Sequence, residues 1–237
     1  MSNIRLYYPN SISKNTTSLL SKEHTHYVAN VMRLKRGSNI NFFNQEGEWA
    51  SEVIFLEKDR VEVKFLNKIK EPLKSSSIEL AICLIKKNPM DIILQKATEL
   101  GVNKIIPIIS ERTEVKELNY IRAKKIVIEA TEQSNQLAPP KISEVIKLND
   151  LLKNLDVETK ILFADVNSKV NLKTLDLKGS KSLCILIGPE GDFSPSERES
   201  ILSIPQVIPF VMSKNILRSD TAVISAISLV NFINNYP

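Results

Sequence analysis

The spacing of apolar residues changes along the chain, and this change predicts two parts of different architecture. In the first part, Ile4 to Leu66, apolar positions come in short extended runs that are separated by turns such as Glu46-Gly47. The predicted strands are Arg5 to Tyr8, Asn39 to Phe43, Trp49 to Phe55 and Val61 to Phe65. This part is therefore predicted to be a small β domain.

One segment of the first part has helical rather than extended spacing. In His24 to Met32, a short helix would turn Tyr27, Val28 and Val31 inward. A basic cluster, Arg33, Lys35 and Arg36, follows directly before a predicted strand. A barrel with such a basic rim is typical of RNA-binding domains.

The second part follows a charged, proline-bearing and serine-rich stretch, Lys68 to Ser77, which has the composition of an exposed connection. We place the boundary near residue 72, which gives domains over 1–72 and 73–237. From there strands and helices alternate, which indicates an α/β fold. The predicted strands are Ile78 to Ile85, Lys104 to Ile109, Lys160 to Ala164, Leu183 to Ile187 and Val207 to Val211, with helices over Pro89 to Leu100 and Glu117 to Gln133.

The apolar run Leu183 to Ile187 ends abruptly in Gly188-Pro189-Glu190-Gly191. Glycine lets a backbone approach a ligand closely and proline stiffens the turn, so this is a candidate ligand loop. Ser194, Pro195 and Glu197 then have the spacing of a capping box at a helix start. Ligands of open α/β sheets bind at such strand-to-helix loops, although an ordinary turn is the alternative interpretation.

A second loop of this kind, Asn215 to Thr221, precedes an apolar helix over Ala222 to Ile233. Ser219 or Asp220 is predicted to cap that helix. Arg218 lies just before the cap, where it is either a functional group or a partner in a surface ion pair.

The composition favours a polyanionic partner and argues against a metal site and a membrane span. The 237-residue chain has a net charge of +5 and a pI near 9.1, and 43% of its residues are hydrophobic, enough for real cores. Cys83 and Cys184 lie in predicted strands without metal-ligand spacing, so no metal is expected. We expect no membrane span and a cytoplasmic location.

Two common nucleotide-binding loops are absent from the sequence. The six glycines, at positions 37, 47, 101, 179, 188 and 191, permit no Gly-x-Gly-x-x-Gly fingerprint. The chain also contains no Gly-Lys-Ser or Gly-Lys-Thr, so a P-loop triphosphatase is excluded.

With these residues in hand, the chain resembles the bacterial 16S ribosomal RNA uracil-N3 methyltransferases, a branch of the SPOUT class, over nearly its whole length. The motifs that carry the resemblance are R-L-Y-Y-P (Arg5 to Pro9), V-M-R-L-K-R-G (Val31 to Gly37), Q-K-A-T-E-L-G-V (Gln95 to Val102), P-I-I-S-E-R (Pro107 to Arg112), E-A-T-E-Q-S (Glu129 to Ser134), I-G-P-E-G (Ile187 to Gly191) and I-L-R-S-D-T-A (Ile216 to Ala222). Seven motifs in the right order make the resemblance specific.

The resemblance implies a PUA-like β-barrel followed by an α/β methyltransferase domain tied into a trefoil knot, which forms a homodimer interface. It implies S-adenosylmethionine as the cofactor and 16S rRNA in the small ribosomal subunit as the substrate. The residues that it assigns to the cofactor are Leu186, Ile187, Gly188, Pro189, Glu190, Gly191, Met212, Ser213, Asn215, Ile216, Leu217 and Thr221. The chain departs from the family pattern at Ser213, usually glycine, at Asn215, often arginine, and in Asn135-Gln136-Leu137, where an arginine usually follows Glu-Gln-Ser.

The implied reaction transfers a methyl group to N3 of one uridine. Arg218 is expected to orient the uracil and stabilise its anionic charge, and Glu190 and Asp220 are the nearest carboxylates. The expected RNA contacts are Arg5, Arg33, Lys35, Arg36 and Arg112, each with a solvated surface role as the alternative. Two other functions remain open: ribose 2'-O-methylation by the same fold, and a non-catalytic RNA-binding factor in ribosome assembly.

Overall fold

The computed structural model describes residues 4–72, 77–154, 156–170, 177 and 182–235. The chain divides into two compact units. Unit 1 comprises Met1–Lys74 and Thr131–Ala138, and unit 2 comprises Ser75–Ala130 and Pro139–Pro237. The predicted domain boundary adjoins residues 73–76, which lie outside the described residues.

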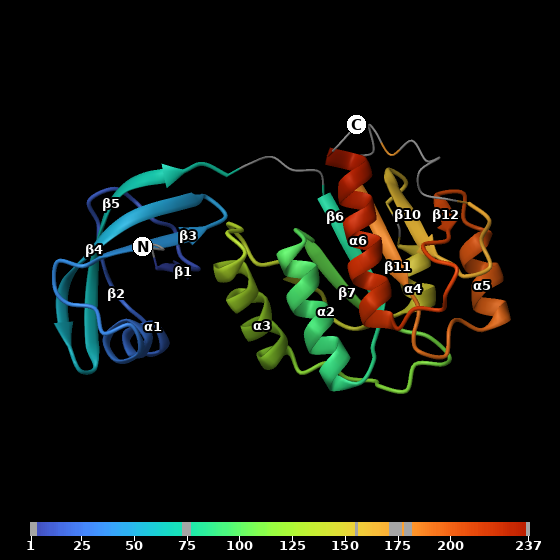
Figure 1. The fold of residues 1–237 in the computed structure, drawn as a ribbon, viewed down its shortest axis with the longest axis horizontal. Helices are drawn as coiled ribbons and strands as arrows, with labels where there is room; N and C mark the ends of the chain where they lie inside the picture. The colour runs from blue at the N-terminus through green and yellow to red at the C-terminus, as the bar shows by residue number, and fades with distance from the viewer. Residues whose placement is uncertain (1–3, 73–76, 155, 171–176, 178–181, 236–237) are drawn as a thin grey trace. The chain divides into compact units, whose positions relative to one another are not determined.

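Unit 1 is built on a five-stranded sheet with the order β1-β3-β4-β5-β2 (Figure 1). Its strands are β1 (Arg5–Tyr7), β2 (Thr17–Leu19), β3 (Asn39–Asn44), β4 (Gly47–Glu57) and β5 (Arg60–Lys70). Alternate residues of β5, Val61, Val63 and Phe65, are buried in one core, as a period of two requires. The hydroxyl of Tyr8 lies 2.7 Å from Ser18 Oγ, so the two edge strands approach each other as in a barrel.

Three details of unit 1 differ from the sequence prediction. β2 is too short to be recognised by alternation, and β5 continues to Lys70, so the supposed connection begins later than Lys68. The helical segment is α1 (Lys22–His26), capped by Ser21, followed by a π-helical turn over Tyr27–Val31. Only Val28 of this turn is buried, because the wider turn leaves Tyr27 and Val31 exposed to solvent.

Arg5 pairs with a buried carboxylate and links the barrel strands to the segment Thr131–Ala138. Its guanidinium pairs with Glu48, whose side chain is only 6% exposed, at 3.0 Å. The same group donates hydrogen bonds to the backbone carbonyls of Glu132 and Gln136, both at 3.0 Å. The Glu132 carboxylate accepts a bond from the amide of Tyr7 at 2.9 Å. These contacts explain why Thr131–Ala138 belongs to unit 1.

Unit 2 is a parallel sheet with the order β12-β10-β11-β6-β7-β8, and β9 also pairs with β7. Its strands are β6 (Ser77–Cys83), β7 (Lys104–Ile109), β8 (Lys141–Ile142), β9 (Ile146–Lys147), β10 (Thr159–Ala164), β11 (Ser182–Ile187) and β12 (Val207–Phe210). Its helices are α2 (Lys87–Glu99), α3 (Tyr120–Gln133), α4 (Leu148–Lys153), α5 (Pro195–Leu202) and α6 (Ser219–Asn235). The predicted α/β class is confirmed.

The central strands of unit 2 are buried on both faces, which explains their uninterrupted apolar sequence. Leu80 and Ile185 face one core together with residues of α2 and α6, which lie side by side on that face (Figure 1). Cys184 and Leu186 face a second core on the side of α4 and α5. A sheet covered in this way exposes its loops at the carboxyl ends of the strands.

The trefoil knot stays a prediction. The chain between β10 and β11 would form part of any such threading, and in this stretch residues 171–176 and 178–181 lie outside the described residues.

Candidate functional site

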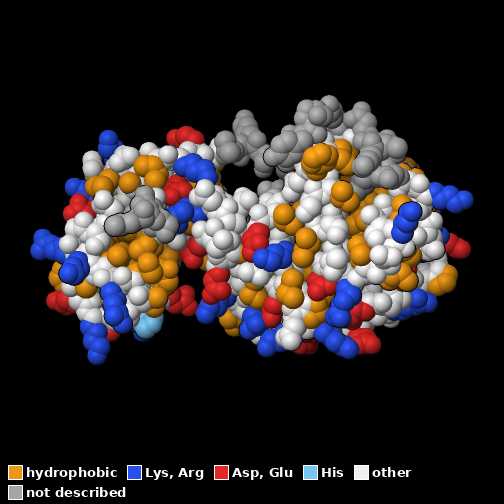
Figure 2. Space-filling view, in the orientation of Figure 1, with side chains coloured by type: hydrophobic (Ala, Val, Ile, Leu, Met, Phe, Trp, Pro, Cys, Tyr) orange, Lys and Arg blue, Asp and Glu red, His pale blue; other side chains and the backbone are white. Residues whose placement is uncertain are grey.

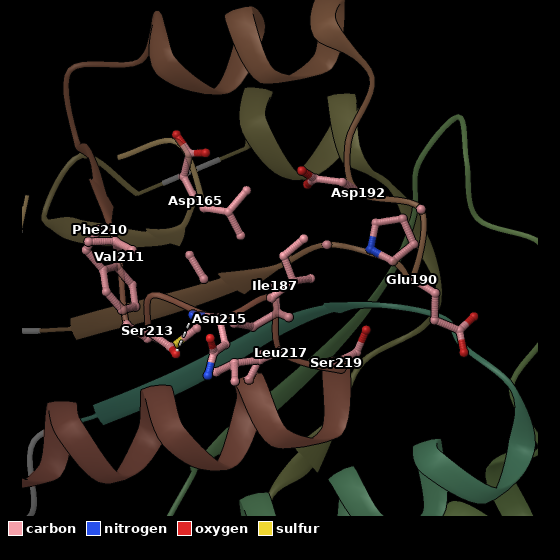
Figure 3. Close-up of a pocket in the computed structure, with 18 residues that line it drawn as sticks. Asp165, Ile187, Glu190, Asp192, Phe210, Val211, Ser213, Asn215, Leu217 and Ser219 are labelled. Carbon is pink, nitrogen blue, oxygen red and sulfur yellow. Dashed lines mark hydrogen bonds between the residues drawn. The ribbon is translucent and has the colours of Figure 1, made fainter. Parts of the chain in front are cut away.

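Two loops of unit 2 enclose one pocket of about 320 Å³. One loop follows β11, and the other follows β12. β11 and β12 flank β10 and run parallel to it, so the three carboxyl ends meet at one edge of the sheet. The pocket is lined by Ala164, Asp165, Val166, Ile187, Gly188, Pro189, Glu190, Gly191, Asp192, Phe210, Val211, Met212, Ser213, Asn215, Ile216, Leu217, Ser219 and Ala222 (Figure 3).

The loop after β11 is held in a tight turn by its own atoms. The amide of Asp192 donates to the carbonyl of Pro189 at 3.0 Å, and the Asp192 carboxylate accepts the amide of Phe193 at 2.8 Å. Gly188 suits this turn, since a Cβ at this position would lie 3.1 Å from the Phe193 ring, closer than most Cβ contacts. The expected capping box then starts α5, with Ser194 and Glu197 exchanging hydrogen bonds, so this prediction is confirmed.

The glycine loop is also braced from outside by the turn after β7. Arg112 Nη1 donates to the carbonyl of Gly191 at 2.9 Å, and the arginine stem packs 3.7 Å from the position that a Cβ on Gly191 would take. The amide of Glu111 donates to the buried carboxylate of Glu197 at 2.8 Å. This turn therefore joins the glycine loop to the start of α5.

The loop after β12 contains a side-chain turn at Ser213, where the sequence departs from the pattern of the family that it resembles. Ser213 Oγ accepts a hydrogen bond from the amide of Asn215 at 3.0 Å. The backbone at Ser213 does not have a positive φ, so glycine is not required there. Met212 and Leu217 are partly buried against the core and fix the two ends of the loop.

The cap of α6 differs by one residue from the prediction. The helix begins at Ser219, and the amide of Ala222 donates to the carbonyl of Arg218 at 2.8 Å. Arg218 therefore occupies the cap position in place of Ser219 or Asp220. Its side chain is 79% exposed, with Nε 4.0 Å from Asp220 Oδ1.

An acidic residue at the end of β10 contributes to the pocket and was missed by the sequence analysis. Asp165 is buried, and its carboxylate lies 2.7 Å from Arg198 Nη2 of α5. The hydrogen bond to Asp165 raises the pKa of the Arg198 guanidinium. Its position in the sequence could have identified it, because Asp165 directly follows a predicted buried strand.

A second hollow of about 420 Å³ adjoins the pocket. The two share Pro189, Glu190, Ile216, Leu217 and Ser219. The hollow is completed by Ile85, Lys86, Pro89, Glu114, Arg218 and Asp220. Figure 3 shows the Glu190 side chain directed away from the centre of the first pocket. Among the described residues, its carboxylate accepts no hydrogen bond and so does not brace its own loop.

The structure brings together ten of the twelve residues assigned to the cofactor. Leu186 and Thr221 do not line the pocket. Leu186 is buried in the core on the α4 and α5 side of the sheet, because side chains alternate along β11. Thr221 lies in the first turn of α6 and is exposed. Arg218 borders the second hollow rather than the pocket itself.

The five residues expected to contact RNA have different environments. Arg33, Lys35 and Arg36 are exposed in unit 1. Arg5 is occupied by the partners described above, and Arg112 holds the glycine loop of unit 2. In the view of Figure 2, Lys and Arg side chains are interspersed with Asp and Glu rather than gathered into one basic face.

In the described part of the chain, no group of three or more His, Cys, Asp or Glu side chains is placed to hold a metal. No helix among these residues is long and apolar enough to cross a membrane. Both cysteines are buried, and burial raises the pKa of the Cys83 thiol to about 11 and that of Cys184 to about 12.

The chain matches two families of known domains. The family described as RNA methyltransferase domain matches residues 71–231, and the RNA methyltransferase PUA domain matches residues 20–66. A ribosomal RNA small subunit methyltransferase E of Rickettsia conorii is 33% identical over 237 residues, which cover 98% of this chain and 96% of that protein.

Two solved methyltransferase structures are similar to this chain over nearly its whole length. A ribosomal RNA small subunit methyltransferase E from Neisseria gonorrhoeae, bound to S-adenosyl methionine, has a TM-score of 0.90 at 27% identity, covering 99% of this chain and 100% of that chain. A putative methyltransferase from Legionella pneumophila, also in complex with this cofactor, has a TM-score of 0.89 at 27% identity and covers 99% of both chains.

Proposed function

Because the chain belongs to the ribosomal RNA small subunit methyltransferase E family, we propose that it methylates N3 of one uridine in 16S rRNA, using S-adenosylmethionine. Family membership establishes the chain as an S-adenosylmethionine-dependent rRNA methyltransferase; the nucleoside and the atom are the proposal. The observation that supports it most is the pairing of the loop-lined pocket with an adjoining hollow that carries Arg218.

The first pocket has the chemistry that S-adenosylmethionine needs. Ile187, Phe210 and Leu217 offer apolar walls for an adenine ring. Asp165 and Asp192 supply carboxylates for hydroxyl or amino groups. When bound, the cofactor supplies a methyl group on a positively charged sulfur, a leaving group that needs no acid.

The protein must then supply orientation and charge to the acceptor base. A uracil N3–H is a poor nucleophile until its proton is removed, and the negative charge then spreads over the flanking carbonyls. Arg218 borders the hollow and carries a guanidinium cation, so it stabilises that developing anion. Glu190 borders both cavities and accepts the proton.

RNA recognition is assigned to the cations that the fold leaves accessible. Arg33, Lys35 and Arg36 of unit 1 are exposed, and phosphate contacts of this kind make affinity fall steeply with salt. We further propose that the chain acts as a homodimer through unit 2, where Ile216 is 89% exposed despite being apolar. A ribosomal substrate places this activity in the cytoplasm.

The test is transfer of a labelled methyl group to isolated small subunits and to naked 16S rRNA, followed by digestion and mass identification of the nucleoside. The proposal requires N3-methyluridine. A 2'-O-methylated nucleoside would assign the chain to ribose methylation, and absence of both transfer and S-adenosylmethionine binding would indicate a non-catalytic assembly factor.

A further inference from the structure

We propose that the hollow bordered by Arg218 is the binding site of the target uracil, and that Lys86 is a specificity residue which binds one of its ring carbonyls. The inference rests on the proposed function and deepens it. It adds an element that the motifs did not identify, the junction between β6 and α2.

The position of the hollow suits an acceptor base. It shares Pro189, Glu190 and Leu217 with the cofactor pocket, so a ring bound in it lies beside the methyl donor. Methyl transfer requires the reacting atoms to come within about 3 to 3.5 Å, which only an adjoining site allows. Pro89 and Ile216 supply apolar surface on which a planar ring can pack.

The charges of the hollow favour a base over a phosphate group. Its charged lining consists of two cations, Lys86 and Arg218, and three carboxylates, Glu114, Glu190 and Asp220. Three carboxylates against two cations disfavour a phosphate group, because it carries negative charge itself. A uracil imide instead presents two acceptor oxygens on either side of one N–H donor. It therefore needs two donors and one acceptor in a single site.

The backbone of Lys86 is anchored beside the hollow. It is the N-cap residue of α2, directly before Lys87, and its carbonyl accepts the amide of Met90 at 3.1 Å. Its neighbour Ile85 and also Met90 are 3% exposed, so the backbone is anchored in the core on both sides. The Lys86 ammonium makes no ion pair with any described residue. It is therefore available to a ligand.

Cations placed at both ring carbonyls select uracil over cytosine. The ammonium group donates to a ring carbonyl, whereas cytosine presents an amino donor at the position of one of these oxygens. The positive charge also stabilises the deprotonated imide, so it lowers the pKa of bound uracil N3. Arg218 and Lys86 would thus share the two carbonyls, leaving the imide proton to Glu190.

The test compares single-turnover methyl transfer to small subunits by wild type, Lys86→Gln, Lys86→Arg and Lys87→Gln, across a range of pH and at saturating S-adenosylmethionine. Lys87 is the matched control, because this exposed neighbour borders a different groove with Met90 and Asp91. Binding of S-adenosylmethionine, melting temperature and the product nucleoside are measured on the same preparations.

We expect Lys86→Gln to be about tenfold slower at neutral pH, with the acid limb of its rate profile moved about one pH unit upward. Its cofactor affinity stays within twofold of wild type, Lys86→Arg retains most of the rate, and Lys87→Gln behaves as wild type. An unshifted profile in Lys86→Gln, or an equal effect of Lys87→Gln, overturns the inference while leaving the proposed function intact. A wild-type product other than N3-methyluridine overturns the proposed function, and the assignment of this hollow to uracil with it.

Discussion

Arg112 donates a hydrogen bond to the backbone carbonyl of Gly191 across 79 residues of sequence, at 2.9 Å. The contact ties the turn after β7 to the glycine loop after β11, so this arginine acts on the pocket without lining it. Its sequence motif alone suggested an RNA contact, because an exposed cation does not reveal which backbone carbonyl it reaches.

Replacing Arg112 by alanine is therefore expected to weaken S-adenosylmethionine binding by about tenfold, the loss of one charge-assisted hydrogen bond. Isothermal calorimetry measures the affinity directly. Arg122→Ala is the control, because Arg122 pairs with Asp91 outside the pocket. Equal affinities of Arg112→Ala and wild type would show that the glycine loop holds its shape without this brace.

Removing the Ser213 hydroxyl from the second loop is expected to weaken cofactor binding less than the Arg112 substitution does. Ser213→Ala removes the oxygen that accepts the amide of Asn215, and the turn loses one neutral hydrogen bond on an exposed loop. We expect cofactor affinity to fall by about two- to fivefold. Ser213→Thr keeps the hydroxyl and should retain wild-type affinity in the same calorimetric assay. A Ser213→Ala protein that binds more tightly than wild type would contradict this role.

We predict that Arg5 contributes mainly to the stability of unit 1 rather than to RNA binding. Arg5→Ala leaves the buried carboxylate of Glu48 without its cation, which costs about 3 kcal/mol of unfolding free energy. Trp49 is the single tryptophan and lies in β4, so its fluorescence during urea unfolding reports on unit 1.

The matched control for this experiment is Arg60→Ala in the same unit. The Arg60 side chain is 60% exposed and its pair with Glu62 lies on the surface, so the expected change is at most about 1 kcal/mol. If both variants unfold at the same urea concentration, the buried Arg5–Glu48 pair stabilises unit 1 no more than the exposed Arg60–Glu62 pair does.

Neither thiol should react in the folded protein. Burial raises the pKa of Cys83 to about 11 and that of Cys184 to about 12, so both remain protonated at pH 8, and both side chains are shielded from reagents. Mass spectrometry after iodoacetamide treatment should find no adduct until denaturant is added. Rapid labelling of the native protein would contradict the burial of these strands.

Local patterns predicted most of the elements of this fold. The capping box at Ser194 and the strand over Lys104–Ile109 depend on neighbouring residues only, and both occur as expected. Elements without a complete pattern were missed, such as the three-residue β2 and the two-residue β8. These strands are stabilised by their partners, because their own residues are too few to show a period.

Contacts between distant segments could not be predicted from the sequence. Nothing next to Asp165 indicates Arg198, and nothing next to Arg5 indicates the carbonyl of Gln136 131 residues away. The same holds for Lys86, which joins the rim of a functional hollow only because β6 lies next to β11 in the sheet. Strand order thus decides which of the many surface cations share a site.

The central claim is that Arg218 acts on the acceptor base beside a separate donor pocket. The most direct test measures labelled methyl transfer to small subunits by Arg218→Ala and, on the same preparation, its affinity for S-adenosylmethionine. Loss of charge stabilisation in the transition state predicts a rate at least about 100-fold lower, with cofactor affinity within about threefold of wild type. Turnover close to that of wild type would contradict the account.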